Sequence, residues 1–135
     1  MVDIVITPGN VIADPSAKIT DGTAGATITA GQWVYLDGTV NQFKLADADG
    51  AAALRSPVGA ALHGASAGQP LKVATSGLVT IGGTLAPGVA YYLSKTAGGL
   101  APVADIAAGG YATVLGIAIS AAVLRINITE SGVAV

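Results

Sequence analysis

Short apolar runs separated by turn residues dominate the chain, and no stretch repeats its apolar positions with the period of a helix. Residues 33–36 and 43–45 are rich in strand formers, and the intervening Asp37-Gly38 is a dipeptide typical of hairpins. Further strands are expected at 58–62, 71–75, 78–81, 90–93, 100–103, 113–119 and 122–128. Short strands at a spacing of about 8–12 residues predict an all-β protein, a small β-sandwich or barrel.

One stretch of the chain occurs twice. Residues 31–37 read Gly-Gln-Trp-Val-Tyr-Leu-Asp, and 57 positions later residues 88–94 read Gly-Val-Ala-Tyr-Tyr-Leu-Ser. Three further stretches also match: residues 45–48 resemble 103–106 at an offset of 58, residues 58–62 resemble 115–119 at an offset of 57, and residues 71–73 resemble 124–126 at an offset of 53. One match could arise by chance in a chain rich in Ala and Gly. Four in the same order predict two pseudo-repeated β units, at about 25–81 and 82–132.

Residues 1–24 have no counterpart in the second half of the chain. Val2, Ile4 and Ile6 suggest a short strand, but Pro8 and Pro15 argue against a central one. We therefore expect an extended N-terminal arm over 1–24, followed by a β domain over 25–135. An edge strand of the domain is the alternative for this segment.

The composition favours a chain that associates. Hydrophobic residues make up 52% of the chain, mostly as small side chains, and charged residues only 10%, with a net charge of −2. Because a monomer normally carries more charge, much of this surface is expected to be buried in an assembly; a monomer coated with Thr, Ser, Gly and Ala is the alternative. The cationic residues form no cluster, which excludes nucleic acid as a partner. The longest apolar run, 111–124, is shorter than the roughly 20 residues of a membrane span, and the N-terminus lacks the basic region of a secretory signal. A soluble protein made in the cytoplasm is expected.

Residues suited to catalysis are scarce. His63, the one histidine, lies in a Gly/Ala/Ser loop with no acidic residue near it in sequence, and is expected to face solvent. Asp47-Ala48-Asp49-Gly50 resembles the start of a calcium loop, but the later ligands are missing, so a polar turn is the better interpretation. The Gly-Gly pairs lack the Lys and Ser/Thr of a phosphate loop, and the chain has no Cys. We expect no enzyme activity, no cofactor and no metal.

Several motifs resemble the capsid decoration (cement) proteins of tailed bacteriophages. They are Ala-Gly-Gln-Pro-Leu-Lys-Val-Ala-Thr-Ser-Gly at 67–77, Leu-Ala-Pro-Gly-Val-Ala-Tyr-Tyr-Leu-Ser at 85–94, Gly-Gly-Leu-Ala-Pro at 98–102, the 35–37 hairpin with its downstream Ala-Asp run, and the strand at 114–118. The resemblance covers about 25–128. It implies a β-rich module, commonly a homotrimer, on the exterior of the capsid in the virion. Its expected partners are the major capsid protein, reached by the arm, and further copies of itself.

The candidate residues for the capsid or subunit interface are apolar side chains of the arm and of the first aromatic strand: Val2, Ile4, Ile6, Val11, Ile12, Trp33 and Tyr35. For Trp33 and Tyr35, burial in the core of the chain is the alternative to a subunit interface, and either is favoured over a ligand-stacking role. A second function stays open at this point, because similar repeats occur in phage fibres and spikes. That function is a carbohydrate- or receptor-binding module, which requires Trp33 or Tyr91 to be exposed for stacking.

Overall fold

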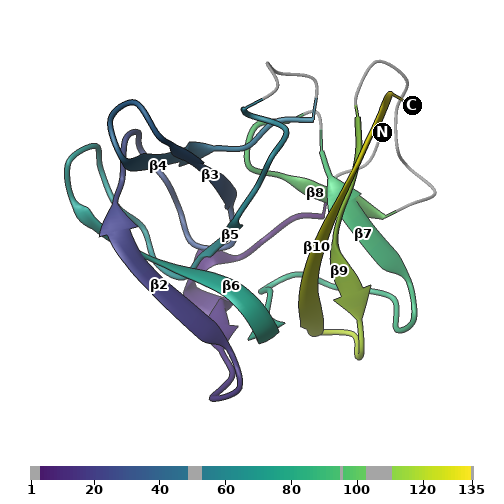
Figure 1. The fold of residues 1–135 in the computed structure, drawn as a ribbon. Coiled ribbons are helices and arrows are strands. Elements are labelled where there is room, and N and C mark those ends of the chain that lie inside the picture. Colours follow the sequence, from purple (N-terminus) through teal and green to yellow (C-terminus); the bar gives the residue numbers. More distant parts are fainter. Residues whose placement is uncertain (1–3, 49–52, 95, 103–110, 135) are drawn as a thin grey trace.

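A computed structural model describes residues 4–48, 53–94, 96–102 and 111–134, the last four by their backbone only. Ten strands, antiparallel in every ladder, form one strongly curled sheet with the shape of a half-barrel (Figure 1). The predicted all-β class is confirmed. No helix of the described residues is long and apolar enough to cross a membrane.

The elements follow the predicted spacing of short strands and turns. They are the 3-10 turn η1 (Pro8–Asn10) and the strands β1 (Ile12–Ala13), β2 (Lys18–Thr23), β3 (Trp33–Asp37), β4 (Gln42–Leu45), β5 (Gly59–Ala61), β6 (Pro70–Thr80), β7 (Ala90–Leu93), β8 (Leu100–Pro102), β9 (Tyr111–Ala118) and β10 (Val123–Ala134). The strand order is β4-β3-β5-β6-β10-β9-β7-β8, and β1 and β2 pair with β6.

The strand order has the same connectivity when it is read inward from either edge. We call β3–β6 the first strand set and β7–β10 the second. In the first set Val34 pairs with Leu45 and Trp33 with Ala60; 57 residues later Tyr91 pairs with Pro102 and Ala90 with Ile117. The two sets therefore share one register along three strands.

The last strand of each set follows a different offset from the one we predicted. Ala61 pairs with Val73, and at the equivalent place Ala118 pairs with Leu124. The predicted match of 71–73 with 124–126 is therefore wrong by two residues. Both stretches alternate apolar and cationic side chains, and a shift by two residues preserves such a pattern.

The first hairpins of the two sets are also alike, but neither is closed by a two-residue turn. Asp37 Oδ1 accepts the Thr39 N–H at 3.0 Å, and Ser94 Oγ accepts the Thr96 N–H at 3.0 Å. The left-handed residue is Asn41 (φ 55°), not Gly38. The hairpin at Asp37-Gly38 was thus predicted correctly in place and wrongly in turn type.

The first 24 residues, expected as an extended arm, contribute two strands to the sheet of their own chain. Ile12 and Ala13 pair with Thr80 and Val79, and β2 pairs with Pro70–Ser76 over its whole length. The prolines Pro8 and Pro15 lie outside both strands, so they do not interrupt the pairing. This corresponds to the edge-strand alternative for that segment.

β6 is longer than predicted, because Ser76-Gly77 does not end it. Gly77 adopts φ 89°, and the β2 ladder steps over one residue here, from Ser76 to Ala74. A Cβ at Gly77 would lie 2.6 Å from the Ser16 carbonyl oxygen, so the bulge is tightly covered. Similarly, residues 130–132, predicted as the start of a tail, continue β10.

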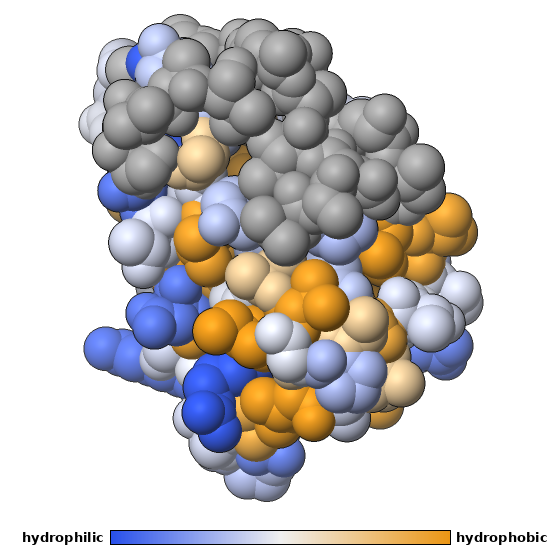
Figure 2. Space-filling model, turned by 90° about the vertical axis from the view of Figure 1, so that its right-hand side faces the viewer, coloured by the Kyte–Doolittle hydropathy of each residue, from blue (hydrophilic) through white to orange (hydrophobic). Residues whose placement is uncertain are grey.

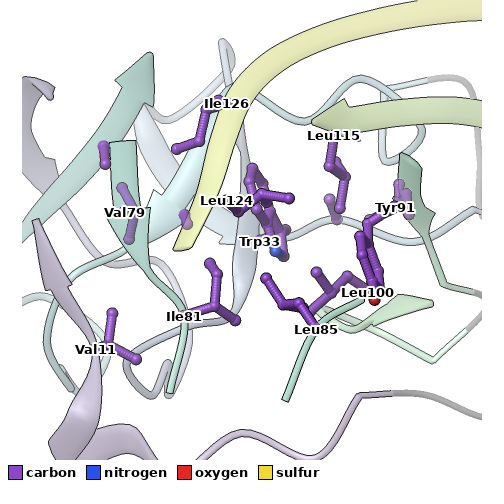
Figure 3. Close-up of a cluster of buried hydrophobic side chains, with 14 of the residues drawn as sticks. Val11, Trp33, Val79, Ile81, Leu85, Tyr91, Leu100, Leu115, Leu124 and Ile126 are labelled. Carbon is purple, nitrogen blue, oxygen red and sulfur yellow. The ribbon is translucent and has the colours of Figure 1, made fainter. Parts of the chain in front are cut away.

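Two clusters of buried side chains lie on opposite faces of the first strand set. The smaller fills the concave side of that set and contains Val34, Phe43, Leu71 and Val73. The larger joins the opposite face, with Trp33 and Tyr35, to the concave side of the second set (Figure 3). Its other large members are Val11, Val79, Ile81, Leu85, Tyr91, Leu93, Leu100, Leu115, Leu124 and Ile126. The second set thus wraps around the outer face of the first.

Candidate functional site

Large apolar side chains lie exposed at several places on a chain that carries little charge. Val5 is 85% exposed and Ile12 on β1 63%; the others are Ile19, Leu36, Val40, Ile117 and Ile119. Figure 2 shows apolar side chains gathered over the second strand set, interrupted by strongly hydrophilic ones. Large apolar side chains that gather on one exposed face are candidate contacts for a partner.

The outer face of the second strand set explains part of this patch. In the first set the outward residues Trp33, Ala60 and Ala74 are buried, because the second set covers them. The positions with the same register in the second set are Ala90, Ile117 and Arg125. Of these, Ile117 is 49% exposed, and Arg125, its partner on β10, is also exposed. No other part of the described chain covers this face. We call Ile117, Ile119 and the half-buried Ala90 and Tyr92 the outer patch.

A second feature lies where the N-terminal segment crosses the second strand set. The Ile4 N–H donates to the Leu100 carbonyl oxygen at 2.9 Å, and the Thr7 N–H donates to the Gly82 carbonyl oxygen at 2.9 Å. Ile4 and Ile6 are half-buried against the main core, whereas Val5 between them is exposed. A cavity of about 220 Å³ lies beside them, bounded also by Gln32 and the loop 96–99.

The predicted interface residues are not brought together on one surface. Val11, Trp33 and Tyr35 are buried in the chain's own core, so the interface interpretation of these three is corrected in favour of the core alternative. Ile4 and Ile6 are half-buried, Ile12 is exposed, and Val2 lies outside the described residues. Sequence reasoning missed Ile117 and Ile119. Their alternation with the buried Ala118 was the available signal, but it does not tell which face of a strand is covered.

His63 is held by the backbone on both sides of its ring and does not face solvent freely. Its Nε2 accepts the Lys72 N–H at 3.1 Å, and its Nδ1 lies 2.9 Å from the Gly64 carbonyl oxygen. An accepting Nε2 places the single proton of the neutral ring on Nδ1, from which it is donated to Gly64. The ring therefore joins the loop after β5 to β6, which is a structural role.

Two surface ion pairs link neighbouring strands. Lys44 Nζ lies 2.8 Å from Asp37 Oδ2, and Lys72 Nζ lies 2.9 Å from Asp21 Oδ1. The hydrogen bond from Lys44 lowers the pKa of Asp37, and the same bond raises the pKa of Lys44. A hydrogen bond from the Ser16 backbone N–H lowers the pKa of Asp14. Exposed pairs of this kind contribute little to stability and form no reactive site.

The described residues hold no group of three or more His, Cys, Asp or Glu side chains placed to bind a metal. Of the stretch that resembles a calcium loop, Asp49 and Gly50 lie outside those residues. A cation–π contact joins the two strand sets nearby, with the Arg55 guanidinium 3.6 Å from the centre of the Tyr111 ring. The arrangement is suited to contact with a large partner through apolar surface. No protein-family model matches the chain, and no curated protein matches it.

Proposed function

We propose that the chain is a structural virion protein, a capsid decoration protein that binds the outer surface of an assembled phage head and bridges major capsid protein subunits. In this proposal the two strand sets descend from a duplicated β unit, and the protein acts as a homotrimer. The observation that carries the proposal is the outer patch: exposed apolar residues on a rigid sheet face, in a chain with only 10% charged residues.

The physical basis of the proposed activity is binding to assembled shells. A protein that binds only the assembled shell stabilises it by mass action, and this requires complementary surface rather than reactive groups. Three residues of the outer patch lie on paired strands, Ile117 on β9 and Ala90 and Tyr92 on β7, and Ile119 directly follows β9; the pairing of β9 with β7 and β10 holds these side chains in place. A rigid surface loses little conformational entropy on binding. Such a surface therefore suits a decoration protein that binds many equivalent positions on a capsid shell.

The alternative function, a carbohydrate- or receptor-binding module, requires an exposed aromatic ring at Trp33 or Tyr91. Trp33 is fully buried and Tyr91 is 2% exposed, so neither offers a ring face on which a sugar could stack. We therefore do not propose this second function.

Binding to shells tests the proposal. Purified chain is mixed with empty heads assembled from the major capsid protein of the phage that encodes it, and in parallel with the unassembled capsid protein. We expect the chain to sediment with heads, not to bind unassembled subunits, and to raise the temperature at which heads disrupt. The variant Ile117→Asp should lose this binding at unchanged thermal stability. The matched variant Thr20→Asp, on the exposed face of β2, should retain it. A wild-type chain that does not sediment with heads would refute the proposal.

A further inference from the structure

The outward face of the sheet continues from the outer patch onto β10, β6 and β1. Thr80 on β6 pairs with Ile12 of β1 on one side and with Val123 of β10 on the other. Residues directly opposite each other in an antiparallel pair share a face, so these three side chains point the same way. Their neighbours Val79 and Leu124 point into the main core, whereas Ile12 is 63% exposed and Thr80 and Val123 are half-buried. The row Ile12-Thr80-Val123 therefore faces outward.

A second outward row carries one charge at each end. Leu78 on β6 pairs with Arg125 on β10, and on its other side the Asp14 N–H, directly after β1, donates to the Leu78 carbonyl oxygen at 3.0 Å. This hydrogen bond continues the register of β1 by one residue, and the alternation from Ile12 places Asp14 on the outward face. Asp14 and Arg125 are exposed, and Leu78 between them is half-buried.

Both charged groups keep capacity for a further partner. Neither Arg125 nor Asp14 is in an ion pair within the described parts of the chain, where the pairs are Lys44 with Asp37 and Lys72 with Asp21. Asp14 Oδ1 accepts the Ser16 N–H at 3.0 Å, which orients the carboxylate. The second row thus has an anion, an apolar residue and a cation in sequence across three strands. Such a row is complementary to itself after a half-turn about its middle residue.

We propose that this face binds a second copy of the chain through a twofold contact along β6. The contact surface, which we call the pairing strip, consists of Ile12, Asp14, Leu78, Thr80, Val123 and Arg125. A twofold axis parallel to β6, in the plane between two packed sheets, places β10 of each copy opposite β1 of the other. Arg125 of each copy then faces Asp14 of the other, and Val123 faces Ile12. One contact thus forms two ion pairs and joins apolar residues to apolar residues.

The pairing strip is separate from the outer patch. Ile117 and Ile119 lie on the far side of β10 from the axis, and β1 ends this part of the sheet on the opposite side, so no strand of the second copy lies against them. The twofold contact therefore does not depend on binding to a capsid, and it can join two of the proposed trimers. The strip is smaller than the roughly 20–30 residues a side of a standard interface, so the association is expected to be weak.

Charge exchange between two copies tests the contact. Sedimentation velocity is measured on full-length chains from about 1 μM to 1 mM, the range in which weak contacts form. The wild-type chain should double its number of chains per particle. Arg125→Asp and Asp14→Arg each place like charges opposite each other and should weaken the association about tenfold or more. An equimolar mixture of the two variants restores both ion pairs, so it should form full-size particles with equal amounts of each chain.

The matched control is Lys18→Asp, a charge reversal at an exposed position of β2 outside the strip, which should associate like the wild-type chain. Wild-type particles that are no larger than those of Arg125→Asp at every concentration would overturn the proposal. A mixture of Arg125→Asp and Asp14→Arg that stays as small as the separate variants would also overturn it.

A cross-link at the twofold axis is an independent measurement. Because Thr80 lies on β6, the axis brings it opposite Thr80 of the second copy, at the spacing of about 10 Å between packed sheets. The chain has no natural cysteine, so Thr80→Cys should be joined to itself by a bismaleimide of about that length. Thr20→Cys, at an exposed position of β2, is the control and should give little product. Equal yields of covalent dimer from the two variants would refute the twofold contact.

Discussion

Gly59 and Gly116 occupy the same place in the two strand sets, and neither has room for a methyl group. A Cβ on Gly59 would lie 2.1 Å from the Ala74 carbonyl oxygen, and a Cβ on Gly116 would lie 2.1 Å from the Arg125 carbonyl oxygen. Both contacts are with the backbone of the adjacent strand, so no side-chain rotation can relieve them. Gly59→Ala should force β5 away from β6, and Gly116→Ala should force β9 away from β10.

The expected loss of stability follows from two contributions. Inserting a methyl group into a packed interior costs about 1–3 kcal/mol. Separating the strands also weakens backbone hydrogen bonds, each worth about 1 kcal/mol net. We expect each variant to lose about 3 kcal/mol of the free energy of unfolding, a large share of the roughly 5–15 kcal/mol of a typical domain. For a chain of this size the loss corresponds to a fall of about 10 °C in the melting temperature.

Two further glycines serve as controls for this prediction. Gly38 has open space around an added Cβ and no positive φ, so Gly38→Ala should change stability by about 0.5 kcal/mol or less. Gly88 also has open space but adopts φ 81°, so Gly88→Ala should lose about 1–2 kcal/mol from backbone strain alone. Urea unfolding followed by circular dichroism measures all four variants. If Gly59→Ala and Gly116→Ala are as stable as Gly38→Ala, the close packing of strand backbones is refuted.

Substitutions at three other positions test the core and the surface. Trp33→Ala should lose about 3–5 kcal/mol in guanidinium unfolding, whereas Trp33→Phe should lose markedly less. The indole Nε1 is buried and has no hydrogen-bond partner among the described residues, so its removal offsets part of the lost packing. Tyr91→Phe should lose about 1 kcal/mol, because the Ala86 N–H donates to the Tyr91 hydroxyl at 2.8 Å; an unchanged unfolding midpoint would contradict this. In an NMR titration of the carboxyl carbon, the pKa of Asp37 should lie below the ordinary value of about 3.9, and Lys44→Met should raise it. Because folding lowers this pKa, the stability that the pair contributes is present above the unfolded pKa and is lost as the pH falls through the folded pKa. If Lys44→Met leaves the pKa of Asp37 unchanged, the pair is not formed.

Strand positions were predictable here because the turns are marked by Gly, Pro, Asp and Asn. The hairpins after residues 36 and 93 show this, and their shared register follows from the repeated Tyr-Leu pattern. β2 was not predicted, because Lys-Ile-Thr-Asp-Gly-Thr lacks an apolar face; β6 supplies the pairing that its own residues do not encode. We predicted two strands in place of β6 because Ser-Gly is typical of a turn. In the structure Gly77 keeps its place in the strand with a positive φ and pairs with Ile126, close to the position where the β2 ladder skips a residue.

The candidate surface was less predictable for a physical reason. Trp33 and Ile117 both lie on outward faces of their strand sets, yet Trp33 is buried and Ile117 is half exposed. The difference arises from how one set wraps around the other, which is a contact between segments distant in sequence. Periodicity within a strand identifies two faces, and only tertiary packing decides which face is covered.

β6 has a consequence for how the protein unfolds. Its first part pairs with β5 and β2, and its remainder pairs with β10 and β1, so one continuous strand belongs to both halves of the sheet. Neither half can melt without removing the hydrogen-bonding partner of the other, and a single cooperative transition follows. A fragment cut after β6 would expose the edge of residues 77–80, which would promote aggregation. The similar halves of this chain are therefore thermodynamically inseparable.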